Sequence, residues 1–206
     1  NNEALAASFD IIVKMKEAGI LYEAESTEGR AGALNNGTVA SVVNAPWFIS
    51  SIRQAEDQKG LWRAARIPRI STLDSSINAS NVGGSSWYVL ENSEVKDDAI
   101  AFLQGVWEGN TDFYDTIMRN QGAMGSYIPA YDTGVYEEVD EFFGGQKLNG
   151  LFAEVLPDVI PVNYGGYVAE ANDAITTALA NLFEGKTDIN GALEQAESQL
   201  SNQLGR

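Results

Sequence analysis

Three short segments have the composition of β-strands, and helical patterns fill most of the remaining chain. The strand-like segments are 38–43, which is rich in β-branched residues, 62–67, which ends at Pro68, and 85–90, which follows a glycine pair. Strands alternating with longer helical stretches are typical of an α/β chain. Three strands are too few to form a closed sheet, and this shortage bears on how much of a complete fold the chain contains.

The predicted helices are bounded by capping residues and by glycine or proline at their ends. The clearest example is 166–184, where apolar residues recur at helical spacing and Gly185 follows. Pro46 is well suited to the first turn of another helix, because its missing N–H costs nothing there. The full set of predicted helices is 3–18, 27–34, 46–57, 94–108, 111–121, 137–143, 151–156, 166–184 and 189–203.

Composition restricts the possible partners. The 206 residues are 44% hydrophobic, which is enough for one large core or for two lobes. A formal charge of −16 argues against nucleic acids and anionic membrane surfaces. No apolar run approaches the roughly 18 residues of a membrane span. The start lacks the features of a signal peptide, so we expect that a signal was removed or that the chain begins partway through a longer one.

The chain contains neither cysteine nor histidine, which excludes whole classes of chemistry. Disulfides, thiolate metal sites and serine–histidine catalysis are impossible, and we expect no cofactor or metal. A glycan-active enzyme would have to use paired carboxylates such as Asp97 and Asp98, or Glu137 and Glu138. These pairs lie on predicted polar surfaces, so we expect no enzyme, but this alternative stays open.

Five aromatic residues lie at the ends of predicted elements, next to glycine, proline or asparagine: Trp47, Trp87, Tyr127, Tyr164 and Tyr167. Aromatic residues at such junctions fit a binding cleft better than a core. A flat ring packs against the apolar face of a sugar, while asparagine and serine bond its hydroxyl groups. The pair Trp47 and Phe48 is divided by this reasoning, with Phe48 expected in the core and Trp47 at the ligand.

The order of these features resembles the carbohydrate-type extracellular solute-binding proteins of bacterial ABC importers. The resemblance covers essentially the whole chain, although Ala45 stands where the family usually has glycine. The segments that carry it are Leu-Asn-Asn-Gly-Thr-Val-Ala at 34–40, Asn-Ala-Pro-Trp at 44–47, Ile-Pro at 67–68, Gly-Gly at 83–84, the helix at 93–107 with Ala99, Phe102 and Leu103, and Tyr-Ile-Pro-Ala at 127–130.

The resemblance implies an α/β fold like that of type II periplasmic binding proteins. Family members are about twice as long, so the chain resembles the C-terminal half. Residues 1–83 and 131–206 would form the C-terminal lobe, and 84–130 would be the hinge and a segment crossing to the other lobe. The apolar face of that crossing segment would then need the missing N-terminal half or a second copy as its partner.

The resemblance also implies a non-catalytic receptor that binds a sugar outside the cell and delivers it to an ABC transporter permease. Trp47 would stack on the sugar and Asn44 would donate to a hydroxyl. Gly83 and Gly84 would form the hinge. The other implied ligand-binding residues are Ser85, Trp87, Tyr127, Tyr164 and Tyr167. The protein would be a lipoprotein on the extracellular face of the cytoplasmic membrane or a periplasmic protein. A binding protein for another solute, such as a polyamine or metal chelate, remains an alternative.

Overall fold

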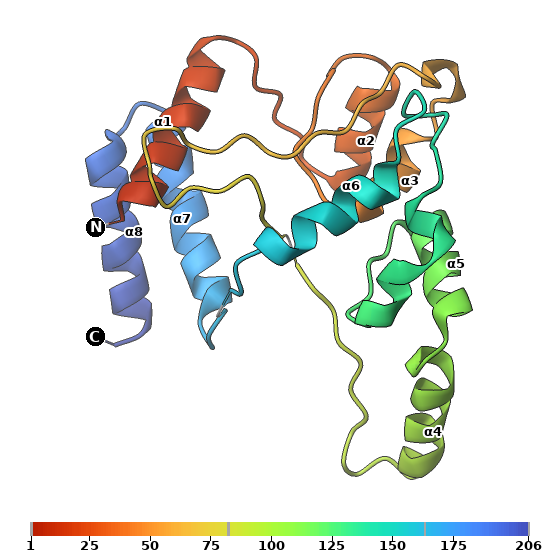
Figure 1. Cartoon of the computed structure of the whole chain (residues 1–206). Coiled ribbons are helices and arrows are strands. Elements are labelled where there is room, and N and C mark those ends of the chain that lie inside the picture. The colour runs from red at the N-terminus through yellow and green to blue at the C-terminus, as the bar shows by residue number, and fades with distance from the viewer. Residues whose placement is uncertain (1, 82, 163, 206) are drawn as a thin grey trace. The chain divides into compact units, whose positions relative to one another are not determined.

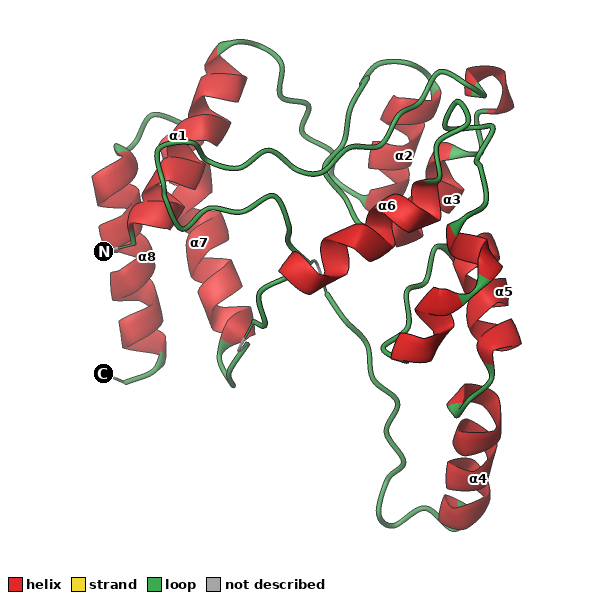
Figure 2. Ribbon diagram, in the orientation of Figure 1, coloured by secondary structure: helices red, strands yellow, loops and turns green. Residues whose placement is uncertain are grey.

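The regular elements in the described part of the chain are all helices. The computed structural model describes residues 2–81, 83–162 and 164–205. Figures 1 and 2 show helices joined by long loops. The α-helices are α1 (Glu3–Glu17), α2 (Thr27–Asn35), α3 (Ile49–Ile52), α4 (Lys96–Trp107), α5 (Thr111–Gln121), α6 (Leu148–Val155), α7 (Val168–Phe183) and α8 (Ile189–Gln203). Short 3₁₀ helices are η1 (Pro46–Phe48), η2 (Glu56–Gln58), η3 (Ile128–Asp132), η4 (Gly134–Tyr136) and η5 (Leu156–Asp158).

The prediction of an α/β fold like that of type II periplasmic binding proteins is wrong for this structure. Within the described residues no sheet forms. The β-type pairing found there is an isolated antiparallel bridge between Asp140 and Gln146. The segments 38–43, 62–67 and 85–90 run without strand partners. A side-chain pattern cannot make a strand by itself, because the backbone groups of a strand need a neighbouring strand to pair with.

One compact unit contains α1, α7 and α8. Its core is made largely of small residues, which let the helices approach closely: Phe9, Ala174, Ala178, Ala192, Leu193 and Ala196. The helix starts are fixed locally, since the Asn2 side chain accepts from two backbone N–H groups of α1 and Asp188 accepts from Gly191 N–H. These caps explain why the predicted starts of α1 and α8 are confirmed. The boundaries of α7, which has no side-chain cap, agree with the prediction to within two residues.

The second compact unit contains α2 to α6 and has two groups of buried apolar residues. The larger group consists of Leu34, Phe48, Ile49, Ile52, Phe142, Phe143 and Leu148. The smaller group, whose residues come from α5 and η4, consists of Met118, Val135 and Tyr136. The predicted division at residues 83 and 130 remains a prediction, because these units describe contacts in the chain and not lobes of a longer protein.

Three helix predictions in this unit differ from the structure, the smallest difference being at 151–156, where the observed helix is Leu148–Val155. The predicted helix 46–57 is divided into η1, α3 and η2. The predicted helix 137–143 is absent, because Asp140 turns the chain: its carboxylate accepts from Phe142 N–H and its own N–H donates to Gln146. Gly144 and Gly145 then continue the turn with φ of +62° and +80°.

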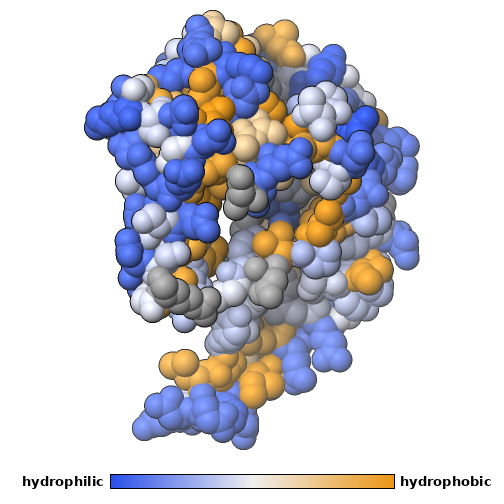
Figure 3. Space-filling model, turned by 90° about the vertical axis from the view of Figure 1, so that its left-hand side faces the viewer, coloured by the Kyte–Doolittle hydropathy of each residue, from blue (hydrophilic) through white to orange (hydrophobic). Residues whose placement is uncertain are grey.

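Helix α4 has no buried residue, although its expected core face is apolar. Phe102 is 68% exposed, while Ala99, Leu103 and Val106 are half-buried. Apolar side chains gather at the lower end of the view in Figure 3, where α4 and the segment before it lie. None of the helices in the described ranges has the length and apolar character needed to cross a bilayer.

Candidate functional site

The two aromatic residues after Pro46 divide between surface and core. Phe48 is 1% exposed, whereas Trp47 is 43% exposed. Their rings meet edge to face, with centroids 5.5 Å apart and planes at 83°. The core position of Phe48 is therefore confirmed. Trp47 presents an aromatic surface to its surroundings, and its role as a ligand contact remains a prediction.

The backbone of Pro46 and Trp47 is held against the end of α5. Gly122 ends that helix in the left-handed conformation, with φ of +62°. A Cβ atom at position 122 would lie 2.3 Å from the Pro46 carbonyl oxygen and 3.3 Å from the Trp47 nitrogen. Only glycine allows both this conformation and this approach. The position of Trp47 thus depends on the C-terminal turn of α5.

Asn44, predicted as a ligand-binding residue, uses only one of its two side-chain amide groups in hydrogen bonding within the described residues. Its Oδ1 accepts from Ala45 N–H at 2.8 Å. Its Nδ2 is buried and has no hydrogen-bond partner in the part of the chain that the structure describes. An unpaired buried amide N–H is costly, so this donor is suited to an acceptor that the chain does not itself supply.

A row of aromatic rings connects two predicted site residues, Trp87 and Tyr127. Trp87 lies 6.2 Å from Trp107, Trp107 lies 5.7 Å from Tyr114, and Tyr114 stacks on Tyr127 at 5.5 Å with planes at 24°, all measured between ring centroids. Trp87 is 70% exposed and Tyr127 is half-buried, while Tyr114 is buried. The row therefore runs from the surface at Trp87 through a buried ring to Tyr127.

Helix α5 positions this row. Asn110 caps its start, accepting from Phe113 N–H at 3.2 Å. Tyr114, one turn into the helix, packs directly on Gly125, where a Cβ atom would lie 2.2 Å from the ring. A side chain at 125 would displace Tyr114 and with it the stacked Tyr127.

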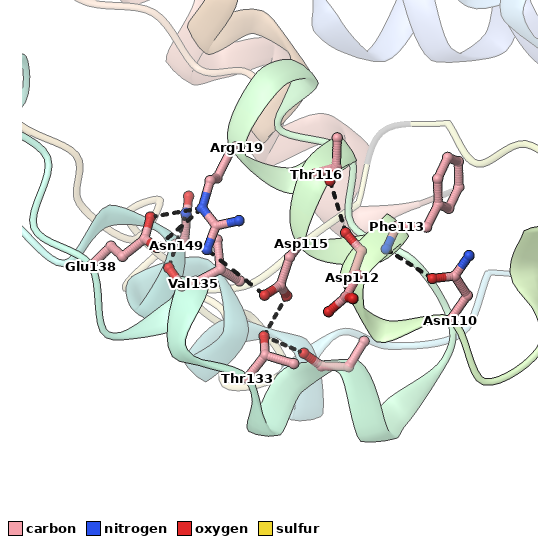
Figure 4. Close-up of polar contacts among 11 residues, drawn as sticks. Asn110, Asp112, Phe113, Asp115, Thr116, Arg119, Thr133, Val135, Glu138 and Asn149 are labelled. Carbon is pink, nitrogen blue, oxygen red and sulfur yellow. Dashed lines mark hydrogen bonds and ion pairs between the residues drawn. The ribbon is translucent and has the colours of Figure 1, made fainter.

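A polar network fixes the opposite side of α5 (Figure 4). Arg119 makes three hydrogen bonds to Glu138, the shortest of them 2.7 Å long, and lies 3.8 Å from Asp115. The Thr133 hydroxyl donates to Asp115 at 2.5 Å. The bond from Arg119 lowers the pKa of Glu138 and raises that of the guanidinium. These charged groups satisfy one another, so we assign them to holding α5 and not to ligand chemistry.

Two tyrosines in the 3₁₀ helices η3 and η4 have raised pKa values. Burial raises the pKa of Tyr136 to about 12, and burial raises the pKa of Tyr131 as well. The Tyr131 hydroxyl donates to the Gly125 carbonyl, the residue on which Tyr114 packs. A high pKa keeps a phenol protonated at neutral pH, so neither tyrosine can act as a base there.

The predicted hinge glycines have backbone conformations that other residues rarely adopt. Gly83 has φ of +84° and Gly84 has φ of +138°, and a Cβ on either would meet nothing within 4 Å. Ser85 follows them and is exposed. Glycine is favoured here by the dihedral angles alone, and the role of this pair as a hinge remains a prediction.

Tyr164 and Tyr167 precede α7, in the other compact unit from Trp47. Both are about half exposed, at 48% and 53%. The Tyr167 carbonyl accepts from Ala171 N–H and so begins the helix. The contribution of both tyrosines to ligand binding remains a prediction.

Several of the paired carboxylates are engaged in ion pairs, and others are exposed. Glu137 bonds Lys147 at 2.7 Å, which lowers the pKa of Glu137, and Asp140 pairs with Arg53. Asp97 and Asp98 lie in the exposed first turn of α4. Across residues 2–81, 83–162 and 164–205, no three acidic side chains come close enough together to hold a metal ion.

Trp107 and Tyr114 were not among the predicted site residues. The predicted helices that contain them were expected to pack on a core, and the predicted aromatic site residues all lie beside glycine, proline or asparagine. The signal that could have found Trp107 is its place as the last residue of α4, two residues before Gly109 and three before the capping Asn110.

The sequence comparison supports a relationship to sugar-binding proteins. The relative is the lactose-binding protein of Rhizobium radiobacter, with 35% identity over 203 residues, 98% of this chain. The chain spans about half the length of this relative, at 48%. No family model matches the chain. The resemblance to carbohydrate-binding solute receptors is confirmed by this relative.

Proposed function

We propose that this chain is the C-terminal half of a receptor that binds a carbohydrate outside the cell and delivers it to an ABC transporter permease, without chemical conversion. The observation that carries the proposal is the 35% identity with a lactose-binding protein across nearly the whole chain. The relative is named for binding and not for catalysis. The carboxylate pairs engaged by Lys147, Arg119 and Arg53 agree with a non-catalytic role.

The proposed contacts follow from the exposed aromatic rings. Trp47 would stack on a sugar ring, because an indole matches the apolar face of a pyranose. The free Nδ2 of Asn44 would donate to a ligand oxygen. Trp87 and Tyr127 would offer further aromatic surface through the row that joins them. Tyr164 and Tyr167 remain candidates for additional stacking.

The neutral character of these groups supports a neutral ligand. The aromatic and amide residues named here carry no charge, and amine ligands such as polyamines would call for carboxylates among the aromatic rings. Gly83 and Gly84 would act as the hinge, with Ser85 at its end. Closure around the sugar would be driven by contacts made only in the closed state.

The experiment is a titration of the intact protein with mono- and oligosaccharides, followed by tryptophan fluorescence. We expect saturable quenching or enhancement with a restricted set of neutral sugars, lactose among them. Chromatography of the sugar after incubation gives the second readout. Recovery of unchanged sugar supports a receptor, whereas hydrolysis would establish the glycan-active enzyme instead. Saturation by a polyamine or metal chelate alone would establish a receptor for another solute.

A further inference from the structure

Three Asn–Gly pairs occur in the chain, at 36–37, 149–150 and 190–191. Such a pair can lose ammonia without an enzyme, because the glycine nitrogen attacks the side-chain carbon of the asparagine and no Cβ hinders the approach. The reaction needs an accessible carboxamide and a glycine N–H that can leave its hydrogen bond. The three pairs meet these two requirements to different degrees.

Asn36 lies in the turn that follows α2, and both Asn36 and Gly37 are exposed. The Oδ1 atom of Asn36 accepts from Thr38 N–H at 2.9 Å. The ring closed by this hydrogen bond contains the Gly37 nitrogen, so the bond keeps the carboxamide close to the atom that attacks it. The Thr38 N–H also stabilises the negative charge that develops on Oδ1 during the attack.

The Gly37 N–H can be released at little cost. It donates to the Leu34 carbonyl at 3.1 Å, at the end of α2, where helices fray. The same carbonyl accepts from Gln58 Nε2 at 3.0 Å, so it keeps a partner when Gly37 turns away. A Cβ at position 37 would meet nothing within 4 Å, which shows that the surroundings leave room for this movement.

The pair at 149–150 is held inside a helix. Asn149 lies in the first turn of α6, and its Nδ2 donates to the Val135 carbonyl at 3.2 Å. Gly150 is packed against the Tyr136 carbonyl, where a Cβ would lie 2.7 Å from the oxygen. Ring closure would therefore require the start of α6 to leave its packing.

The pair at 190–191 is exposed at its asparagine but held at its glycine. The Gly191 N–H donates to the Asp188 carboxylate that caps α8, at 2.8 Å. A neighbouring negative charge opposes the loss of a proton from this nitrogen. Asn190 therefore matches Asn36 in exposure and differs from it in the state of the attacking group.

We propose that Asn36 is a site of spontaneous deamidation and that its product weakens the end of α2. The Gly37 nitrogen gives its proton to hydroxide and bonds to the side-chain carbon of Asn36, and the amide nitrogen takes up a proton and leaves as ammonia. Water then opens the succinimide at either carbonyl, which gives aspartate or isoaspartate. Both products carry a new carboxylate at the C-terminal end of α2, where the helix dipole disfavours negative charge. This inference does not depend on sugar binding.

The test is incubation of the intact protein in mildly alkaline buffer, followed by peptide mapping with mass spectrometry. We expect Asn36 to convert at least tenfold faster than Asn149 and Asn190. In urea, which removes the fold, the three pairs should convert at similar rates. Equal rates in the folded protein would overturn the proposal, and so would an order of rates that stays the same in urea.

Asp188→Ala tests the difference between the two exposed asparagines. The substitution frees the Gly191 N–H and removes the charge beside it, so conversion at Asn190 should rise at least tenfold while conversion at Asn36 stays unchanged. Asp173→Ala, at an exposed position of α7, is the control and should change neither rate. Unchanged conversion at Asn190 in Asp188→Ala would contradict the role assigned to the glycine N–H.

The consequence for α2 is tested with aspartate substitutions. Asn36→Asp places the charge of the product at the C-terminal end of α2, and Asn190→Asp places the same charge in the first turn of α8, where the helix dipole favours it. We expect a lower melting temperature for Asn36→Asp than for Asn190→Asp. Equal melting temperatures, or the reverse order, would overturn the claim that deamidation weakens α2. Sugar affinity is measured separately and tests the proposed function.

Discussion

Trp47 and Phe48 are consecutive residues whose rings meet edge to face, yet 43% of Trp47 is exposed and 1% of Phe48. One ring stabilises the core and the other is available to a ligand. The pair therefore offers a matched test, because each residue should affect a different measurement.

Replacing Trp47 with alanine should weaken sugar binding by the intact protein by roughly 1–3 kcal/mol, as expected for a stacking contact. Its free energy of unfolding should change little. The control, Phe48→Ala, should lower the free energy of unfolding by about 3–5 kcal/mol, since it opens a cavity in the core. Calorimetric titration and urea denaturation measure the two effects. A large loss of stability in Trp47→Ala with unchanged affinity would place Trp47 in the core.

Gly122→Ala should destabilise the protein more than Gly109→Ala does. Both glycines have left-handed dihedral angles, with φ of +62° and +69°, so each substitution should cost roughly 1–2 kcal/mol of strain. At 122 the new Cβ would also meet the Pro46 carbonyl, whereas at 109 it would meet nothing. Urea denaturation of both variants gives the comparison. Equal losses would show that the contact between α5 and Pro46 is not tight in solution.

The side chain of Gln146 should stabilise the segment around Ala64. Its amide makes two hydrogen bonds to the Ala64 backbone, so Gln146→Ala should lower the free energy of unfolding by about 1–3 kcal/mol. Gln104, an exposed glutamine of α4, provides the control, and Gln104→Ala should be nearly neutral. If both variants unfold at the same urea concentration, the contact with Ala64 does not contribute to stability.

Stability should fall at high pH because of Tyr136. Burial raises its pKa from 10.0 to about 12, so the folded protein holds this proton more tightly than the unfolded chain. The resulting stabilisation is complete below pH 10 and is lost as the pH rises from 10 towards 12. Tyrosinate absorbance and urea denaturation across this range measure it. Tyr136→Phe should reduce the pH dependence, and an unchanged slope in that variant would exclude Tyr136 as its source.

The exposed apolar face of α4 should make this chain associate when it is isolated. Phe102 is 68% exposed and no residue of α4 is buried, so the face remains open to a partner. Light scattering after size exclusion should show species larger than the 22.2 kDa chain. Phe102→Glu should reduce this association, while Gln104→Glu on the same helix should have a smaller effect. A stable monomer of the unmodified chain would contradict this prediction.

The helices were predictable where their signals are local. Asn2 and Asp188 cap α1 and α8, and Gly185 follows α7, so periodicity and capping are enough to define them. The segment 137–143 has a similar composition, but the Asp140 side chain competes for the backbone and produces a turn. The sequence alone does not show which of these interactions is stronger.

Whether a sheet forms cannot be predicted in the same way, because strand pairing depends on what lies beside a segment. Burial alternates along residues 62–65 as in a strand, yet Ala64 pairs with a side chain and not with another strand. Within the candidate site, the exposed Trp47 was found through its neighbour Pro46. Trp107 was not found from the sequence, because its place in the site depends on its contacts with the rings of Trp87 and Tyr114. Those contacts are formed only by the folded chain.

The central claim, sugar binding without conversion, is tested most directly by calorimetric titration of the intact protein with lactose and related neutral sugars. The account predicts saturable binding at one site, recovery of unchanged sugar, and a loss of affinity of roughly 1–3 kcal/mol in Trp47→Ala. Absence of binding to every sugar in the panel, or release of cleaved products, would contradict it.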